Sequence, residues 1–570
     1  MSASRVSGGR AVLEVLRAAG VDHAFGVPGE SFMGLMDAIY DDPSIRFVST
    51  RHEEGATFMA TAYARLTGRP ALSMATRMVG GGHASIAIHT ARQDSTPIIV
   101  VLGHVPTAWR HREAFQEVEL AAVFREVAKW AVEPPAADRL AELTFRAART
   151  AISGRPGPVV LAIREDLLAE DVDAPAVRPI VAAAAAPEPA AVRRTLDLLR
   201  SASRPAFLVG GGILAARATA ALVEVAEQEQ VPVFTGWRRP DAFPNNHPLY
   251  LGWAGLRSPE LGFRRLRAAD LIVAVGTRLG EFPTHRYKIP APGTKLVHVD
   301  LAAEDLGGHL QADVACVADA RLFLEALLEA GRAMPPAEDA LAERRRANEA
   351  DRAAWEAATT PGRGRARDGY VDQQVVAARI QPVLDRGGIL ATDAGNFAGW
   401  PARYLRWHEP GTFLGPSSGA MGYGIPSAIG AKLARPDRPV VCVVGDGGFM
   451  MTGTELETAV RENIPVAVVV LDNEQYGTIR MHQEKDHPGR PIGTRLGPID
   501  FAALARALGA RGVTVTDNAE VGDAIDDAVA SDQPTVVHLR LDPDQLFVGD
   551  DEAATDTSAG ALAQPASRGA

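Results

Sequence analysis

Continuous apolar runs, many of them β-branched, alternate with Ala- and Leu-rich segments along almost the whole chain. The clearest runs stand at 98–103, 159–163, 206–212, 271–276, 296–300, 439–444 and 466–471. Runs of this length are typical of strands buried on both faces, and their alternation with helical segments indicates parallel sheets covered by helices. A chain of 570 residues is too long for one hydrophobic core. The sequence therefore predicts an α/β protein built from doubly wound parallel-sheet domains.

Three blocks share this alternation, which gives three such domains. An Ala- and Pro-rich connector at 181–191 follows the first block, and a charged helical stretch at 340–358 follows the second. The last residues are small, acidic and polar, which is typical of disorder. We expect domains at 1–178, 190–335 and 370–549, a linker at 336–369 and a disordered tail at 550–570.

Charge and composition exclude several classes of function. The net charge of −11 argues against a nucleic-acid partner, because phosphate binding needs clustered Lys and Arg. Cys316 and Cys442 lie far apart and form no disulfide framework or metal pair. The first residues lack an apolar signal region, and no apolar run approaches about 18 residues. We expect a cytoplasmic protein that does not span a membrane.

Polar side chains follow two successive strands of the third block. Gly445-Asp446-Gly447-Gly448 ends the run at 439–444, and Asn473 follows the run at 466–471. Thr452 and Glu455 have the spacing of a capping box, which predicts that the intervening helix starts at Thr452. Asp446 and Asn473 then lie at the carboxyl edge of one sheet, where open α/β sheets bind ligands.

These residue types indicate a metal-bridged diphosphate. A carboxylate and an amide oxygen suit Mg²⁺ or Ca²⁺, especially when phosphate oxygens complete the coordination. Gly445, Gly447 and Gly448 allow the backbone to approach an anion closely at the start of a helix. For the glycine motif alone, a tight strand-to-helix turn with a capping Asp explains the pattern equally well. The Asn one unit later favours the metal.

The Gly-Asp-Gly motif with its downstream Asn resembles the thiamine-diphosphate motif. From about Gly8 to Phe547 the chain is similar to the acetolactate-synthase-like family of thiamine-diphosphate enzymes, which includes the benzoylformate decarboxylase type. The resemblance implies a pyrimidine-binding domain, a Rossmann-like middle domain and a diphosphate-binding domain. It implies that Asp446, Asn473 and the backbone carbonyl of Gln475 hold Mg²⁺. The further cofactor contacts that it implies are Gly395, Asn396, Gly419, Met421, Gly445, Gly447, Gly448 and Tyr476.

The cofactor needs a carboxylate beside N1′ of its aminopyrimidine, and this group works best partly desolvated, where its pKa rises. The segment from Arg51 resembles the family signature Arg-His-Glu-x-Gly-Ala, which assigns the role to Glu53. The pattern alone does not separate Glu53 from Glu54, whose side chains point about 100° apart on a helix. Two solvated carboxylates in a first helical turn are the alternative.

The same resemblance places the loop at 416–426, here called the Met421 loop, beneath the bent cofactor. There the Gly419 carbonyl and the Met421 N–H would bond the pyrimidine edge, and the bulky Met421 would support the bend. Gly395 and Asn396 match a loop that approaches the diphosphate. A methionine in a glycine-rich turn is otherwise most often part of the core.

On the substrate side, Gly29 matches a loop facing the thiazolium, and Phe115 and Gln116 match a Phe-Gln pair. Decarboxylases that release aldehydes often carry a His-His pair in this region. A neutral amide can hold the reactive intermediate without protonating it, so this pair favours carbon–carbon bond formation. The loop at 76–83 departs from the family pattern, with bulkier residues and with His83 in place of an amide. His83 is either a proton donor or a solvated loop histidine.

Two further departures concern other regions. The Trp found in many relatives shortly after the metal Asn is missing, and Arg480 or His482 is a candidate to meet a substrate carboxylate there. An arginine that extends to the surface is the alternative. In the second block, Gly210–Ala215 fits Gly-x-Gly-x-x-Ala, which suggests a dinucleotide site. Because 275–282 resembles the branch of the family that does not bind FAD, FAD is possible but is not our main expectation.

The sequence thus predicts a thiamine-diphosphate- and Mg²⁺-dependent enzyme that decarboxylates a pyruvate-like 2-oxo acid and ligates the product to a second carbonyl. A 2-oxo-acid decarboxylase or C–C lyase without ligation is the alternative. A nicotinamide dehydrogenase built on the second block, or a non-catalytic paralogue, are hypotheses from other classes. The resemblance implies a homodimer or homotetramer with an interfacial active site, because Glu53 and the metal ligands then come from different subunits.

Overall fold

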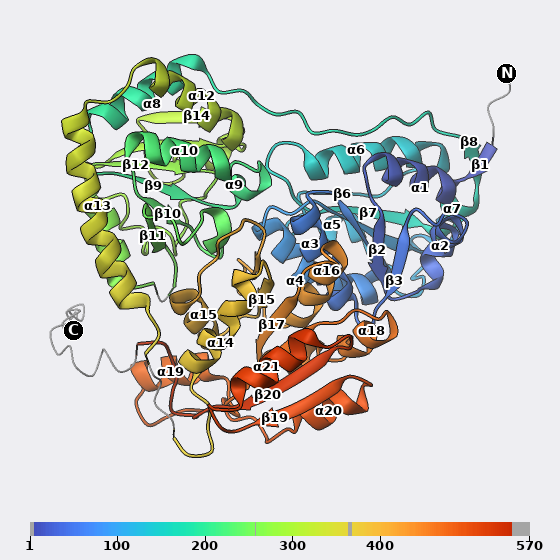
Figure 1. Cartoon of the computed structure of the whole chain (residues 1–570). Helices are drawn as coiled ribbons and strands as arrows, with labels where there is room; N and C mark the ends of the chain where they lie inside the picture. Colours follow the sequence, from blue (N-terminus) through green and yellow to red (C-terminus); the bar gives the residue numbers. More distant parts are fainter. Residues whose placement is uncertain (1–4, 257, 363–366, 550–570) are drawn as a thin grey trace, which may run out of the picture.

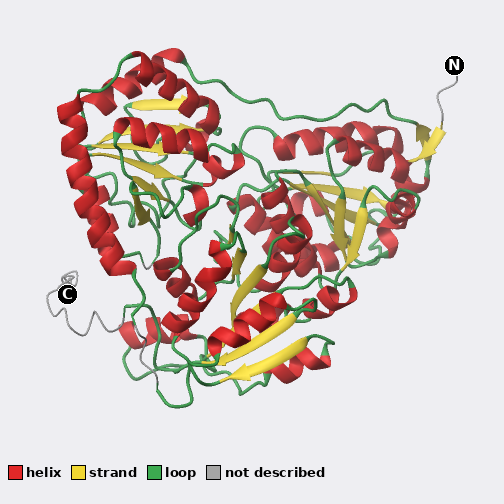
Figure 2. Ribbon diagram, in the orientation of Figure 1, coloured by secondary structure: helices red, strands yellow, loops and turns green. Residues whose placement is uncertain are grey.

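The computed structural model describes residues 5–256, 258–362 and 367–549. Three six-stranded sheets account for most strands of this part of the chain, and all strand pairs within them are parallel. In Figures 1 and 2 the strands of each sheet lie between layers of helices. The prediction of three doubly wound parallel-sheet units is therefore confirmed. The predicted tail at 550–570 lies outside the described residues.

The first sheet has the order β3-β2-β4-β5-β7-β6, and a short antiparallel ribbon, β1-β8, closes the ends of this unit. Ser7 caps the first helix by accepting a hydrogen bond from the N–H of Arg10 at 3.2 Å. The strands are β1 (Arg5–Ser7), β2 (His23–Gly26), β3 (Arg46–Ser49), β4 (Ala71–Thr76), β5 (Ile98–His104), β6 (Trp130–Val132), β7 (Val159–Arg164) and β8 (Asp171–Asp173). The helices are α1 (Gly8–Ala18), α2 (Met33–Tyr40), α3 (Glu53–Thr67), α4 (Arg77–Gln93), α5 (Leu120–Val123), α6 (Leu140–Ile152) and α7 (Glu165–Ala169).

The middle sheet has the order β11-β10-β9-β12-β13-β14. Its strands are β9 (Pro205–Val209), β10 (Val233–Thr235), β11 (Tyr250–Trp253), β12 (Leu271–Val275), β13 (Lys295–Asp300) and β14 (Val314–Val317). The helices are α8 (Pro189–Ser201), α9 (Gly211–Ala215), α10 (Thr219–Glu229), α11 (Glu260–Arg267), α12 (Ala320–Ala333) and α13 (Glu338–Thr359). An irregular segment before α8 runs across from the first unit (Figure 1).

The third sheet has the order β16-β15-β17-β18-β20-β19. Its strands are β15 (Ile389–Thr392), β16 (Phe413–Leu414), β17 (Val440–Gly445), β18 (Ala467–Asp472), β19 (Arg511–Val515) and β20 (Thr535–Arg540). The helices are α14 (Gln373–Asp385), α15 (Gly399–Tyr404), α16 (Gly424–Ala434), α17 (Asp446–Thr452), α18 (Glu455–Arg461), α19 (Gly477–Asp486), α20 (Phe501–Ala507) and α21 (Val521–Ala530). Within the described residues, no helix is both long enough and apolar enough to cross a membrane.

Two local predictions are wrong. The helix after β17 begins at Asp446 and not at Thr452. Thr452 and Glu455 form no capping box. The Thr452 hydroxyl instead donates to the Gly422 carbonyl at 2.8 Å, and the Glu455 side chain binds the backbone of the first unit. The segment 76–83, expected as a loop, enters helix α4 directly after β4. Its glycines provide clearance for packing, since a Cβ at Gly81 would lie 3.1 Å from the Phe124 ring.

The charged stretch before the third unit is the long helix α13, which lies along the middle unit (Figure 1). Trp355 of α13 is buried, and its ring meets Tyr250 edge-on with centroids 5.3 Å apart. The Arg344 guanidinium donates to the carbonyl oxygens of Glu229, at 2.7 Å, and Ala202, at 2.8 Å. Most of the expected linker is therefore a packed helix of the middle unit.

The first and third units pack through helices α3 and α16. A Cβ at Gly430 of α16 would lie 2.4 Å from the carbonyl oxygen of Met59 on α3, so only glycine permits this approach. Phe58 of α3 meets Tyr423 edge-on at 5.2 Å between centroids. Buried side chains of both units form one continuous hydrophobic cluster.

Asp94 is the buried anion where all three units meet. It accepts hydrogen bonds from Arg239 of the middle unit at 3.0 Å and from the Ser417 N–H of the third unit at 3.2 Å, and it lies 3.5 Å from Arg65 of α3. Burial raises the pKa of Asp94, but the charges of Arg239 and Arg65 outweigh burial and lower it. The ionised carboxylate thus holds the three units together.

We expect Asp94→Asn to destabilise the chain by about 3 kcal/mol, because it leaves two buried guanidinium groups without their anion. Chemical and thermal unfolding midpoints measure the change. The matched control is Asp173→Asn, which removes an exposed ion pair with Arg5 at 3.4 Å and should change the free energy of unfolding by less than about 1 kcal/mol. Equal midpoints for the two variants would contradict the role given to Asp94.

Candidate active site

The carboxyl edge of the third sheet brings Asp446 and Asn473 together. Strands β17 and β18 pair in parallel with Gly445 opposite Leu471, so the residues that follow them lie at the same edge. The backbone N–H of Gln475 donates to Asp446 Oδ2 at 3.1 Å, which fixes the loop that carries Asn473 against the carboxylate. The residues predicted to hold the metal thus share one small region.

The electrostatics of this edge fit a cation. Asp446 is 6% exposed and accepts a hydrogen bond from the Gly447 N–H at 2.8 Å. Burial, with a contribution from the neighbouring Asp472 carboxylate, raises the pKa of Asp446 to about 7. Asp472 is itself buried and paired with His538 at 2.8 Å. Two buried carboxylates side by side are costly unless a positive charge compensates them, and oxygen donors of this kind suit Mg²⁺.

The glycines of the motif stand where neighbouring side chains leave no space for a Cβ atom. A Cβ at Gly447 would lie 2.6 Å from the Tyr476 ring, and a Cβ at Gly448 would lie 2.9 Å from Asp393 Oδ2. Gly445 is constrained in the same way, with a Cβ 3.0 Å from the Phe397 ring. The backbone at the start of α17 is therefore buried and packs directly against Tyr476 and against Asp393, which follows β15, and only glycine fits at these positions.

Asp393 anchors the Met421 loop and was not predicted as a site residue, although it lies only two residues before Gly395. Asp393 is fully buried, and its Oδ2 accepts hydrogen bonds from Gly422 N–H at 2.9 Å and Gly424 N–H at 3.3 Å. Burial raises the pKa of Asp393 to about 6. Gly419 and Gly422 have φ of +73° and +81°, in the left-handed region that favours glycine, and half-buried Met421 stands between them.

Asn396 lies beneath the last described segment of the chain. Its backbone N–H donates to the Thr478 hydroxyl at 3.0 Å, and its side-chain amide donates to the Leu546 carbonyl at 2.9 Å. Arg480, a candidate for binding a substrate carboxylate, instead donates to Gln475 Oε1 at 2.9 Å and pairs with Asp544 at 3.0 Å. Residues 543–546 therefore cross the loop of the predicted metal ligands, which the sequence analysis did not foresee.

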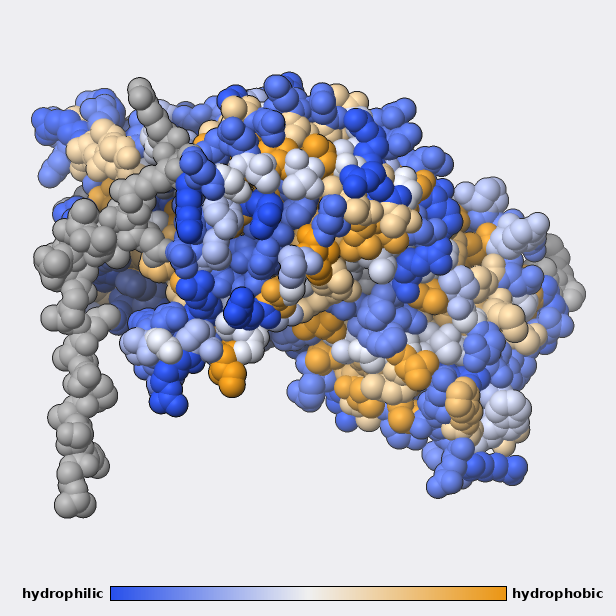
Figure 3. Space-filling model, turned by 90° about the horizontal axis from the view of Figure 1, so that it is seen from below, coloured by the Kyte–Doolittle hydropathy of each residue, from blue (hydrophilic) through white to orange (hydrophobic). Residues whose placement is uncertain are grey.

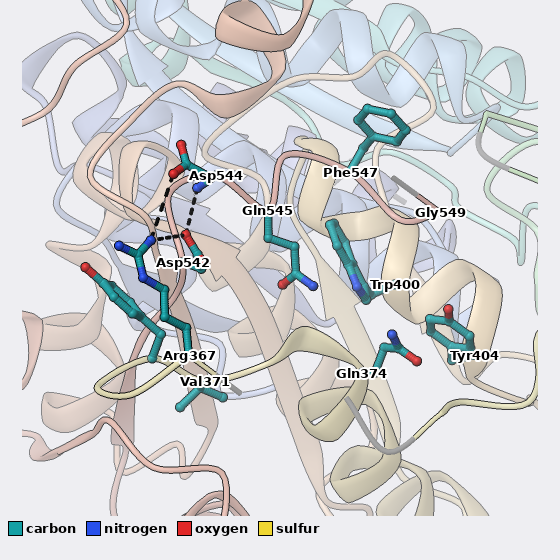
Figure 4. A pocket seen from close by; sticks show the side chains of 11 residues that line it. Arg367, Val371, Gln374, Trp400, Tyr404, Asp542, Asp544, Gln545, Phe547 and Gly549 are labelled. Atoms are coloured by element: carbon teal, nitrogen blue, oxygen red, sulfur yellow. Dashed lines mark hydrogen bonds and ion pairs between the residues drawn. The ribbon is translucent and has the colours of Figure 1, made fainter. Parts of the chain in front are cut away.

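Two hollows flank this terminal segment. One, of about 420 Å³, is lined by Asn473, Gln475 and three arginines, Arg480, Arg495 and Arg540, so it borders the predicted metal site directly. Figure 4 shows the other, of about 210 Å³, between the terminal segment and the aromatic side chains of α15, with Arg367 paired to Asp542 at 3.2 Å. The second hollow contains none of the predicted site residues.

The two glutamates at the start of α3 diverge, as helical geometry requires. Glu53 Oε2 lies 2.8 Å from Nδ1 of His83 on α4. Glu54 turns toward the third unit, where a Cβ at Gly422 would lie 3.0 Å from its Oε1. Burial, with a contribution from the Asp393 charge, raises the pKa of Glu54 to about 7. The role of Glu53 stays a prediction, and Glu54 is the neighbour against which it is tested.

Glu455 holds the start of α3 in place, a role that was hidden by reading Glu455 as part of a capping box. It is fully buried and accepts hydrogen bonds from the backbone N–H groups of Arg51 at 3.1 Å and His52 at 2.9 Å. Burial raises the pKa of Glu455. A Cβ at Gly55 would lie 2.4 Å from its Oε1, so the glycine of the signature admits this carboxylate.

The predicted substrate-side residues gather around the start of α4. A Cβ at Gly29 would lie 1.7 Å from the Thr76 hydroxyl, so Gly29 packs directly on the end of β4. Buried Arg77 donates to the Phe115 carbonyl at 3.2 Å, while the Phe115 side chain is 73% exposed. Gln116 has φ of +64°, and its Oε1 is buried with no hydrogen-bond partner among the described residues.

Other residues of the first two units have structural roles. His104 is a fully buried residue of β5, its Nδ1 accepts a hydrogen bond from the Val105 N–H at 2.9 Å, and burial lowers its pKa to about 4. In the middle unit, the Gly212 N–H donates to the Gly276 carbonyl at 2.9 Å, so these glycines serve the close packing of helix α9 on the segment after β12. Whether FAD binds there stays a prediction.

Comparison with known proteins covers nearly the whole chain. Three family models match: the N-terminal TPP binding domain of thiamine pyrophosphate enzymes at residues 6–123, their central domain at 192–327 and their C-terminal TPP binding domain at 393–539. The acetolactate synthase large subunit of Parasynechococcus marenigrum (strain WH8102) is 34% identical over 555 residues, which is 94% of this chain and 88% of that protein.

Other relatives are also acetolactate synthase large subunits that match nearly the whole chain. The acetolactate synthase isozyme 2 large subunit of Escherichia coli (strain K12) is 30% identical, over 94% of this chain and 96% of its own length. The probable acetolactate synthase large subunit of Methanocaldococcus jannaschii is also 30% identical, over 94% and 92%. The chain therefore belongs to the thiamine pyrophosphate enzyme family.

Proposed function

We propose that this chain is a thiamine-diphosphate- and Mg²⁺-dependent carboligase of the acetolactate synthase type. It decarboxylates a 2-oxo acid such as pyruvate and joins the remaining carbons to a second carbonyl compound, with acetolactate as the default product. The observation that carries this proposal is the similarity to acetolactate synthase large subunits over 94% of the chain.

In this proposal, Asp446, Asn473 and the Gln475 carbonyl hold Mg²⁺, and Mg²⁺ holds the diphosphate. The raised pKa of Asp446, caused by burial and by Asp472, supports the need for a cation at this edge. Further diphosphate contacts come from Gly395, Asn396, Gly445, Gly447, Gly448 and Tyr476. When bound, thiamine diphosphate supplies the carbon nucleophile that adds to the keto group of the 2-oxo acid.

The other predicted residues orient and protect the reacting groups. Glu53 exchanges a proton with N1′ of the aminopyrimidine, and the Gly419 carbonyl and Met421 N–H fix the edge of that ring. Gly29 and Phe115 exclude water from the thiazolium side. Gln116 carries a neutral amide, which places the donor carbons without delivering a proton and so leaves time for the acceptor to react.

We further propose that the active unit is a homodimer or homotetramer with the site between subunits. Glu53 and Gln116 belong to the first unit and Asp446 to the third, and no hydrogen bond joins these residues within the described chain. Met450 and Met451, on the helix of the metal motif, are 53% and 47% exposed, which suits a covered interface. Figure 3 shows orange apolar patches among the blue polar side chains of the face seen from below.

We expect thiamine diphosphate to bind the wild-type chain only when Mg²⁺ is present, because the cation neutralises both the buried carboxylates and the diphosphate. Isothermal titration with and without Mg²⁺ measures this. Asp446→Ala should abolish binding, whereas Asp532→Ala, an exposed aspartate of the same unit, should bind as the wild type does. Absence of Mg²⁺-dependent binding in the wild type would refute the proposed cofactor.

Glu53→Gln should lower kcat on the order of 100-fold to 10,000-fold, because the amide cannot exchange a proton with the cofactor. Binding of thiamine diphosphate, measured by titration, should survive this isosteric change. Glu54→Gln is the matched control and should lose less than about tenfold. If the large loss followed Glu54→Gln instead, the catalytic role would move to Glu54, whose pKa is raised to about 7 by burial.

The products of the reaction separate ligation from simple decarboxylation. With pyruvate as the only substrate, we expect a product that gives acetoin after acid treatment, with little free acetaldehyde, because Gln116 provides no ready proton donor. Colorimetric acetoin determination and an alcohol dehydrogenase assay for acetaldehyde measure the two outcomes. Acetaldehyde as the main product would favour the alternative, a decarboxylase that does not ligate.

A further inference from the structure

Glu53 is part of a cluster with two histidines that the proposed function does not use. His83, on α4, lies with its Nδ1 2.8 Å from Glu53 Oε2. The ring of His52, which precedes α3, stacks on the ring of His83 with centroids 4.3 Å apart and planes inclined by 25°. His83 is therefore not a free solvated histidine, although its side chain is 55% exposed in the single chain.

The first two turns of α4 are shaped to receive the Glu53 carboxylate. Gly80 and His83 are three positions apart and lie on one face of the helix. A Cβ at Gly80 would lie 2.9 Å from Glu53 Oε1, so glycine gives this oxygen its space while His83 contacts the other oxygen. The two residues together define where the carboxyl group lies and how it is turned.

His52 gives His83 a fixed support. The backbone N–H of His52 donates to buried Glu455, and its Nδ1 accepts a hydrogen bond from the Glu54 N–H at 3.3 Å. Burial lowers the pKa of His52, and the nearby His83 lowers it further, against an opposing contribution from Glu53. A neutral His52 ring can stack on His83 without charge repulsion. A chain of contacts thus runs from Glu455 through His52 and His83 to Glu53.

Two histidines and a carboxylate also form a possible ligand set for a cation, since their ligand atoms lie within 4.8 Å of one another. The ring geometry argues against that use. Nearly parallel stacked rings direct their nitrogen lone pairs side by side, whereas ligands of one ion must converge. In addition, His52 Nδ1 already accepts the Glu54 N–H. The hydrogen bond between His83 and Glu53 is the simpler account.

We propose that His83 is a positioning residue for Glu53: its Nδ1–H donates to Oε2 and fixes the carboxyl group in the orientation that the cofactor requires. The inference rests on the proposed function, because it takes Glu53 as the acid that meets the cofactor. A hydrogen bond to Oε2 restricts rotation of the carboxyl group. The other oxygen, Oε1, is then held in one orientation for proton transfer.

Two substitutions of His83 separate the hydrogen bond from the rest of the imidazole. The Nδ2 of an asparagine occupies nearly the place of the histidine Nδ1, so His83→Asn retains the donor to Glu53 and removes the imidazole ring. His83→Ala removes both. His83→Asn is therefore the conservative rescue variant.

The tautomer of His83 is the direct test and does not depend on turnover. In ¹⁵N-histidine-labelled apoprotein at pH 8, the resonances missing from His83→Asn belong to His83. We expect the Nδ1-protonated tautomer in the wild type, because Nδ1–H donates to the Glu53 carboxylate, and loss of this preference in Glu53→Ala. An Nε2-protonated His83 in the wild type would overturn the proposal, because Nδ1 would then accept and not donate.

Turnover of the holoenzyme gives the second test. We expect His83→Ala to lower kcat on the order of 10-fold to 100-fold, with KM for the 2-oxo acid nearly unchanged, and His83→Asn to stay within about threefold of the wild type. Wild-type kcat in His83→Ala, or an equal loss in both variants, would overturn the positioning role. Titration of thiamine diphosphate keeps the two hypotheses apart: if the wild type binds no cofactor, the proposed function fails, whereas normal binding with an unaffected His83→Ala refutes only the inference about His83.

Discussion

The close approach of helices α3 and α16 is the contact on which the rest of the structure depends. At Gly430 the two backbones come so near that a Cβ would lie 2.4 Å from the Met59 carbonyl. This contact merges the cores of the first and third units and sets the start of α3, with Glu53 and Glu54, against the Met421 loop that leads into α16. Any side chain at position 430 would separate the helices and displace both groups of residues.

The edge of the third sheet concentrates buried carboxylates, and the fold compensates most of them with backbone N–H groups. Asp393 binds the N–H groups of the Met421 loop, and Glu455 binds those at the start of α3. Each of these carboxylates ties one loop to the sheet edge. Asp446 likewise accepts the N–H groups of Gly447 and Gln475, but it lies beside a second buried carboxylate, Asp472, and burial together with this repulsion raises the pKa of Asp446. The proposed metal site is thus the place where two buried carboxylates are neighbours.

The fold was largely predictable, because strands buried on both faces appear in the sequence as continuous apolar runs, and each such run is a strand. The adjacency of Asp446 and Asn473 followed from strand topology alone. The predictions that used only the spacing of neighbouring residues in the sequence were wrong. Thr452 and Glu455 have the spacing of a capping box, yet both side chains make tertiary contacts, with the Gly422 carbonyl and with the backbone of His52. Spacing does not reveal such partners, since they lie far away in the sequence.

The glycine-rich segment 76–83 contacts several predicted site residues of the first unit. Thr76 packs on Gly29, Arg77 holds the Phe115 carbonyl, and Gly80 and His83 receive the Glu53 carboxylate. One junction between a strand and a helix therefore organises nearly all the residues that the first unit is predicted to contribute to catalysis. Of the departures that the resemblance indicates, those at 76–83 fall on this junction, beside the predicted catalytic groups of the first unit, whereas the missing Trp falls after Asn473, beside the predicted metal ligands of the third unit. Because the start of α4 contacts Gly29, the Phe115 backbone and Glu53 together, a substitution there changes the surroundings of several predicted site residues at once.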